Sequence, residues 1–120
     1  MKLLIVDDSK VIRDRLRAML YDVENVEVIG EAANYCDAMN AISTTFPGIV
    51  ILDINMPGKN GLDLLLELKT MINPPVAIMM SNYSDIYYRN LCEKMGADYF
   101  FDKSTEFEKI PDVLNALVRL

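Results

Sequence analysis

The sequence contains no histidine among its 120 residues. This absence excludes Ser-His-Asp triads, histidine-containing zinc sites and phosphohistidine donors. Cysteine is scarce too: Cys36 and Cys92 form no C-x-x-C pair, and we expect two half-buried thiols in a reducing cytoplasm rather than a redox sensor. No apolar run approaches the ~20 residues of a membrane span, and the run after Met1 ends at Asp7, too early for a signal peptide.

Positive charge is also limited, with 12 Lys and Arg against 18 Asp and Glu and a formal net charge of −6. This balance disfavours direct binding to nucleic acid or to an anionic membrane, because phosphate contacts need clustered cations. The length predicts one domain over residues 1–120, and the 52% hydrophobic content is typical of a globular protein.

Short apolar runs alternate along the chain with longer segments of helical periodicity. The short runs predict strands at 3–6, 26–32, 49–52, 76–80 and 97–101. The longer segments predict helices at 11–20, with Ser9 as cap, then at 35–43, 62–71 and 85–95, and a last helix that carries Phe107 to Leu117. Five strands alternating with five helices predict an α/β domain whose parallel sheet is covered on both faces.

Polar side chains stand where four of these strands end. Asp7 and Asp8 follow the first strand, Asp53 ends the third, Ser81 follows the fourth, and Lys103 follows the fifth. In an open parallel sheet, ligands bind beyond the carboxyl ends of the strands. We therefore expect three carboxylates, a hydroxyl and an ammonium group to meet at one rim.

Three carboxylates at one rim repel one another and raise each other's pKa unless a cation lies among them. Mg²⁺ suits such a site, because it prefers oxygen ligands and often works with phosphate groups. We expect Asp8 and Asp53 to bind the ion directly and Asp7 to hold a bound water. A backbone carbonyl in the loop after Asp53 would supply a further ligand.

Asp53 is the candidate nucleophile, since a carboxylate can accept a phosphoryl group. Such a transfer depends on positioning and charge neutralisation, for which Mg²⁺ and Lys103 are available. The Ser81 hydroxyl can donate a hydrogen bond to a phosphoryl oxygen. Each residue alone is more typical of a cap, a turn or a surface charge, and it is their joint placement that predicts a functional site.

The chain resembles the receiver domain of two-component response regulators over essentially its whole length. The resemblance rests on Asp7-Asp8-Ser9, on the loop from Asp53 to Gly61, on Ser81, and on the stretch from Gly96 to Lys103. It implies a flavodoxin-like (βα)5 fold, a three-layer sandwich with sheet order 2-1-3-4-5. It also implies that a histidine kinase or phosphotransfer protein phosphorylates Asp53 in a Mg²⁺-dependent reaction.

The resemblance assigns the metal site to four residues. Asp7 and Asp8 match the family's acidic pair, Asp53 matches its phosphoacceptor, and the carbonyl of Asn55 matches its backbone ligand. The side chain of Asn55, together with that of Tyr83, also matches positions that tune the phosphoryl lifetime. Both are equally typical of solvated loop residues.

The resemblance assigns switching to Ser81 and Phe100. In the family, these two side chains move on phosphorylation and reshape the surface formed by the fourth helix, fifth strand and fifth helix. Lys103 matches the lysine that completes the catalytic set with Asp53 and Ser81. Phe100 is nearly as typical of an ordinary half-buried strand aromatic.

The expected output is contact with a downstream protein, for which Tyr87, Tyr88 and Cys92, with Phe107 nearby, offer apolar surface. The alternative to a contact surface is that these residues only pack the fourth helix on the sheet. We expect a cytoplasmic switch that catalyses only its own phosphorylation and dephosphorylation and binds neither nucleic acid nor membrane. Phosphorylation-dependent dimerisation stays open.

Three alternatives remain beside a stand-alone switch. The chain is also consistent with the receiver half of a longer regulator that has a DNA-binding or enzymatic output domain. A haloacid-dehalogenase-type enzyme is disfavoured, because Asn55 stands where that chemistry usually needs a second acid. A flavin-binding module is disfavoured, because Asp7 and Asp8 would repel the phosphate group.

Overall fold

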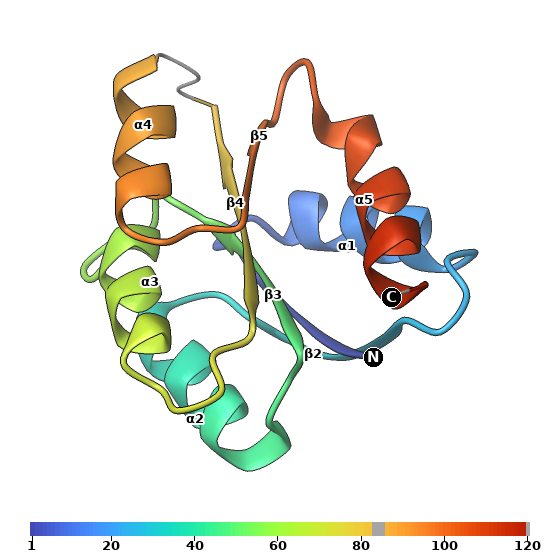
Figure 1. Cartoon of the computed structure of the whole chain (residues 1–120), viewed down its shortest axis with the longest axis horizontal. Coiled ribbons are helices and arrows are strands. Elements are labelled where there is room, and N and C mark those ends of the chain that lie inside the picture. Colours follow the sequence, from blue (N-terminus) through green and yellow to red (C-terminus); the bar gives the residue numbers. More distant parts are fainter. Residues whose placement is uncertain (83–85, 120) are drawn as a thin grey trace.

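The computed structural model describes residues 1–82 and 86–119, which build one parallel sheet (Figure 1). Its strands are β1 (Lys2–Val6), β2 (Glu27–Ala32), β3 (Ile49–Asp53), β4 (Val76–Ser81) and β5 (Tyr99–Asp102). Their spatial order is β2-β1-β3-β4-β5, which confirms the order that the resemblance implied.

Helices cover both faces of the sheet, as the alternating pattern predicts. They are α1 (Lys10–Leu20), α2 (Tyr35–Thr45), α3 (Gly61–Lys69), α4 (Ile86–Lys94) and α5 (Ile110–Val118). Helices α1 and α5 pack on one face, and α2, α3 and α4 pack on the other (Figure 1). Within the described residues, none of these helices has the length and hydrophobicity needed to cross a bilayer.

Side-chain caps determine where the first three helices begin. The Ser9 hydroxyl accepts a hydrogen bond from the Ile12 amide, which confirms the cap expected for α1. Asn34 caps α2 in the same way, and Asn60 forms a reciprocal capping box with Asp63 at the start of α3. The box places the start of α3 directly after the loop that follows β3.

Several element boundaries differ from the sequence prediction by one to three residues, and two of these differences have a clear structural cause. Strand β5 begins at Tyr99, two residues later than expected, because Asp98 bonds to Ala77 through its amide and through its carboxylate. The last helix begins at Ile110, after a 3₁₀ turn at Phe107–Lys109, with proline in its first turn, where no amide donor is needed. Asp85, the expected start of the fourth helix, lies outside the described residues.

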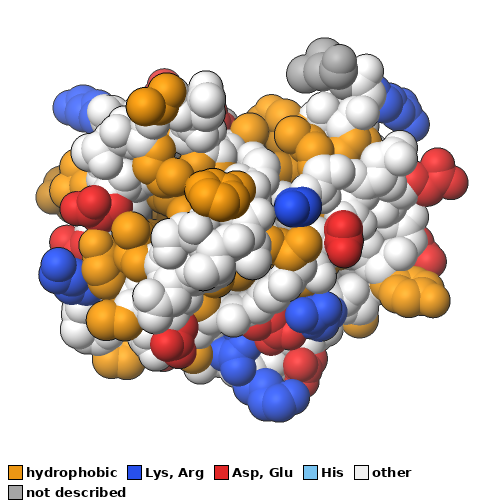
Figure 2. Space-filling view, turned by 90° about the horizontal axis from the view of Figure 1, so that it is seen from below, with side chains coloured by type: hydrophobic (Ala, Val, Ile, Leu, Met, Phe, Trp, Pro, Cys, Tyr) orange, Lys and Arg blue, Asp and Glu red, His pale blue; other side chains and the backbone are white. Residues whose placement is uncertain are grey.

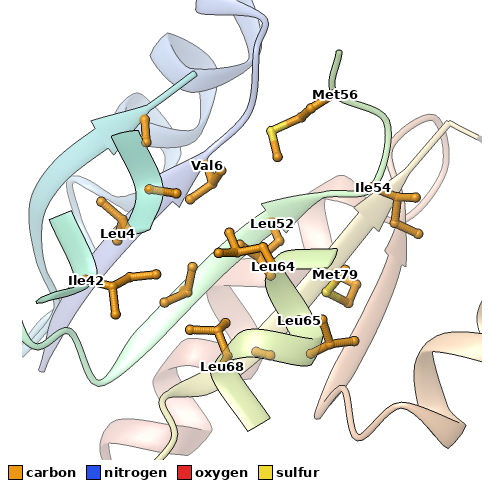
Figure 3. Packing of buried hydrophobic residues seen from close by; sticks show 14 of the residues in the cluster. Leu4, Val6, Ile42, Leu52, Ile54, Met56, Leu64, Leu65, Leu68 and Met79 are labelled. Carbon is orange, nitrogen blue, oxygen red and sulfur yellow. The ribbon is translucent and has the colours of Figure 1, made fainter. Parts of the chain in front are cut away.

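An apolar cluster anchors the segment on both sides of Asp53. Leu52 precedes Asp53 in the chain, and Ile54 and Met56 follow it, and all three are buried between the sheet and the helices. Figure 3 shows that they share this cluster with side chains of α3. The α3 members are Leu64, Leu65 and Leu68. The backbone that carries Asp53 is thus held by the core rather than by an open loop.

The exposure of three residues differs from the sequence prediction. Cys36 is exposed and Cys92 is buried, so the expectation of two half-buried thiols was wrong. Burial raises the pKa of Cys92 to about 11. Phe107 is buried as well, so neither residue adds to an output surface, whereas Tyr87 is 65% exposed.

Gly61 starts α3 against the backbone of the Asp53 segment. Its amide donates to the carbonyl of Ile54 at 3.0 Å, and a Cβ placed on it would lie 2.1 Å from the carbonyl oxygen of Asp53. Such a contact is far inside van der Waals distance. Only glycine lets α3 approach the acidic residue this closely.

We expect Gly61→Ala to lower the free energy of unfolding by about 1–3 kcal/mol, the usual cost of overpacking. Gly30→Ala is the matched control, because its Cβ would meet only Leu4 Cδ1 at 3.7 Å, an ordinary contact. Urea unfolding of both variants measures the difference. Equal stability of the two would show that the close approach is not needed.

Candidate functional site

The carboxyl ends of four strands bring the expected polar residues to one rim of the sheet. Asp53 and Ser81 are the last residues of β3 and β4, and Asp7 and Lys103 directly follow β1 and β5. Hydrogen bonding continues past the strand ends, since the amide of Lys103 donates to the carbonyl of Ser81 at 2.9 Å. The parallel register therefore places side chains from distant parts of the chain side by side.

The carboxylates of Asp7, Asp8 and Asp53 lie close enough to share a cation. One oxygen of each lies within 4.8 Å of the other two. Asp7 is fully buried and Asp53 is only 3% exposed, whereas Asp8 is exposed. Oxygen atoms are the ligands that Mg²⁺ prefers, so the donor set fits this ion.

Lys103 links the two buried carboxylates. Its Nζ lies 2.7 Å from Asp7 Oδ2 and 3.1 Å from Asp53 Oδ1, and its side chain is 6% exposed. One ammonium group faces three carboxylates, so the cluster keeps a net negative charge. That charge favours a bound cation.

Asp7 is held at each of its four polar atoms. Its amide donates to the Ala32 carbonyl at 3.0 Å, and its Oδ1 accepts from the Ser9 amide at 2.9 Å. Its Oδ2 accepts from Lys103, and its carbonyl oxygen accepts from Arg13 Nη1 at 2.7 Å. These four hydrogen bonds restrain both the backbone and the side chain of Asp7.

Burial raises the pKa of Asp53 to about 6, and the negative charge of Asp7 adds to the rise. Lys103 and the amide of Asn55, 3.3 Å from Asp53 Oδ1, act in the opposite direction. Repulsion between carboxylates was the expected cause, but loss of hydration is the larger one. Asp53 is nevertheless mostly ionised at neutral pH.

Of the two expected switch residues, Ser81 ends β4 at this rim and Phe100 lies on β5. Ser81 is fully buried, and Phe100 is half-buried on β5 with the Arg89 guanidinium 4.7 Å from its ring centre. Arg89 also pairs with Glu106, which ties α4 to the segment before α5. Tyr83, expected to tune phosphoryl lifetime, lies outside the described residues.

One face of the molecule carries surface charge of mixed sign. On the face seen in Figure 2, Lys and Arg side chains are interspersed with Asp and Glu and form no single basic area. Hydrophobic side chains are also visible there. This face therefore lacks the clustered cations that contacts with nucleic acid phosphates require.

Comparison with known proteins decides the family. The family model for the response regulator receiver domain matches residues 3–115. The chain belongs to the receiver domain family. The sensory transduction protein LytT of Bacillus cereus is 36% identical over 114 residues, which cover 95% of this receiver domain and 46% of LytT.

A further relative supports the same family, and a solved structure has the same fold. The protein-glutamate methylesterase/protein-glutamine glutaminase of Clostridium acetobutylicum is 33% identical over 99% of this receiver domain and 36% of that protein. The signal receiver domain of a DNA-binding response regulator from Colwellia psychrerythraea 34H has the same fold. It has a TM-score of 0.92 at 24% identity and covers 100% of this chain and 99% of that one. The receiver domain spans about half or less of the length of these two curated relatives.

Sequence reasoning missed two residues of the site, Arg13 and Glu31. Arg13 lies in the second turn of α1 and Glu31 lies on β2 opposite Ile5, and the two form an ion pair at 2.9 Å. Each looks like a surface charge in the sequence. Arg13 contacts the Asp7 carbonyl and Glu31 contacts Arg13, and the position of Glu31 depends on the register of β1 and β2, which the sequence does not display.

The raised pKa of Asp53 predicts a pH-dependent loss of stability when no divalent cation is present. Its folded pKa of about 6 exceeds the ordinary 3.8, so stability is fully present below 3.8 and is lost as the pH rises through 6. In EDTA, we expect Asp53→Asn to unfold with a free energy about 1–2 kcal/mol above wild type near pH 8. Urea unfolding should show this advantage vanish below about pH 4. A pH-independent difference would contradict the assignment.

Proposed function

We propose that this receiver domain is a phosphorylation-dependent switch that accepts a phosphoryl group on Asp53. The observation that carries the proposal is the position of Asp53, 3.1 Å from the Lys103 ammonium and inside the three-carboxylate cluster. Asp8 is exposed, and both carboxylate oxygens of Asp7 already accept hydrogen bonds from the protein. Asp53 therefore combines burial, a cationic neighbour and a place among the metal-binding candidates.

The residues that would hold Mg²⁺ are those of the carboxylate cluster. Asp8 and Asp53 would bind it directly and Asp7 through water, with the carbonyl of Asn55 as a further ligand in line with the family resemblance. When bound, Mg²⁺ supplies positive charge that neutralises the carboxylates and the oxygens of the transferred group. The oxygen-only donor set and the excess negative charge support this assignment.

In the proposed reaction, an ionised oxygen of Asp53 attacks the phosphorus of the donor. The new oxygen–phosphorus bond forms as the bond to the donor's leaving group breaks, and the leaving group takes the bonding electrons. Lys103 already lies beside Asp53, so its ammonium can balance charge on the phosphoryl oxygens without leaving Asp7. The buried Ser81 hydroxyl would donate a hydrogen bond to one of these oxygens.

The proposed donor is a histidine kinase or phosphotransfer protein, and the proposed output is contact with a downstream protein in the cytoplasm. Ser81 and Phe100 would relay the modification from the rim to the surface of α4, β5 and α5. The guanidinium of Arg89 over Phe100 and the exposed Tyr87 on α4 support this surface as the place of readout. The domain itself, proposed to span residues 1–120, would catalyse only its own phosphorylation and dephosphorylation.

A second proposal is that this domain is the receiver half of a longer regulator. The match covers 46% of LytT and 36% of the methylesterase, so both relatives contain further sequence. A DNA-binding or enzymatic output would then belong to residues outside those described. The natural reading frame decides between this and a stand-alone switch.

Phosphorylation of Asp53 can be tested with acetyl phosphate and intact-mass spectrometry. We expect wild type to gain the mass of one phosphoryl group with Mg²⁺ and none in EDTA, and Asp53→Asn to gain none. Asp102→Asn is the matched control, because Asp102 is also a buried acid at a strand end, on β5 rather than β3, and this variant should still be modified. Retention of the added mass in Asp53→Asn would rule out Asp53 as the acceptor.

A further inference from the structure

The side chain of Arg13 joins helix α1 to the peptide bond between Asp7 and Asp8. Its Nη1 donates to the Asp7 carbonyl oxygen at 2.7 Å, and its side chain is only 16% exposed. This oxygen lies in the peptide plane that leads into Asp8. A hydrogen bond to it restrains rotation of the plane, and with it the direction in which the Asp8 side chain leaves the backbone.

Glu31 holds Arg13 in this position. Arg13 Nε lies 2.9 Å from Glu31 Oε1, and Arg17 pairs with the other oxygen of the same carboxylate. Hydrogen bonds from Arg17, and then from Arg13, hold the pKa of Glu31 below its usual value, so Glu31 stays charged. The planar guanidinium is therefore anchored to β2 on one edge and directed at Asp7 on the other.

Asp8 is the member of the acidic pair that needs such support. Ser9 and Lys103 fix the two carboxylate oxygens of Asp7. The carboxylate of Asp8 is exposed, and among residues 1–82 and 86–119 no hydrogen bond fixes it. Its aim toward a shared ion thus depends on the backbone that precedes it.

We propose that Arg13 is a positioning residue of the metal site, which orients Asp8 by holding the Asp7–Asp8 peptide. The inference rests on the proposed Mg²⁺-dependent function. Residues that orient metal ligands commonly contribute about 10–100-fold to metal affinity. Arg13 would contribute in this way although it carries the same sign of charge as the ion.

Charge and positioning predict opposite effects when Arg13 is replaced. If charge alone mattered, removing a cation near the site would strengthen Mg²⁺ binding. If Arg13 positions Asp8, its removal weakens binding. Arg17 is the matched control, because it pairs with the same Glu31 carboxylate, and its hydrogen bond in the described structure goes to Glu31 and not to Asp7.

The test is a Mg²⁺ titration followed by amide NMR on the whole chain, with wild type, Arg13→Met, Arg13→Lys and Arg17→Met. Both Arg13 variants should bind about tenfold more weakly, because lysine keeps the charge but not the two-edged geometry. Arg17→Met should bind like wild type. If Arg13→Met binds Mg²⁺ as tightly as wild type or more tightly, Arg13 is not a positioning residue, and the proposed function still stands. If wild type binds no Mg²⁺, both the role of Arg13 and the proposed function are contradicted.

A second readout needs no metal and guards against variants that merely unfold. In EDTA, the amide resonance of Asp8 should shift in both Arg13 variants and keep its position in Arg17→Met. The remaining spectrum reports whether each variant keeps the native fold. An unmoved Asp8 resonance in a folded Arg13→Met would overturn the inference.

Discussion

The structure depends on one buried ion-pair arrangement, in which the Lys103 ammonium lies between the carboxylates of Asp7 and Asp53. Buried charges are costly unless they are paired and hydrogen-bonded, so each of the three groups requires the others. The pairing is incomplete, since Asp8 adds a third carboxylate nearby. This excess of negative charge favours a cation at the rim and, after burial, contributes to the raised pKa of Asp53.

The rest of the fold can be understood as support for this charge cluster. Apolar packing of Leu52, Ile54 and Met56 fixes the backbone around Asp53, and Gly61 lets α3 approach it. The Arg13 guanidinium pairs with Glu31 on β2 and donates a hydrogen bond to the Asp7 carbonyl, which links β2 to the acidic pair. These contacts hold a cluster of like charges in place at the rim of the sheet.

Much of the architecture and the main site residues could be predicted from the sequence. Strand periodicity and the rule for parallel sheets placed Asp7, Asp53 and Lys103 at one rim, because the ends of strands can be predicted from the local sequence without knowledge of tertiary contacts. The sequence did not predict the contact between Lys103 and Asp7, which lie 96 residues apart, because it depends on the direction in which the two side chains point. Phe107 was expected near a contact surface, because periodicity defines a helical face without showing what covers it.

Burial, and then the charge of Asp7, raise the pKa of Asp53, and we propose that a divalent cation lowers it again. Carboxyl carbon NMR of labelled Asp53 measures this directly. We expect a titration midpoint at about 6 in EDTA and a clearly lower midpoint in saturating Mg²⁺. A midpoint near the ordinary aspartate value of 3.8 in EDTA, or one that Mg²⁺ leaves unchanged, would contradict this expectation.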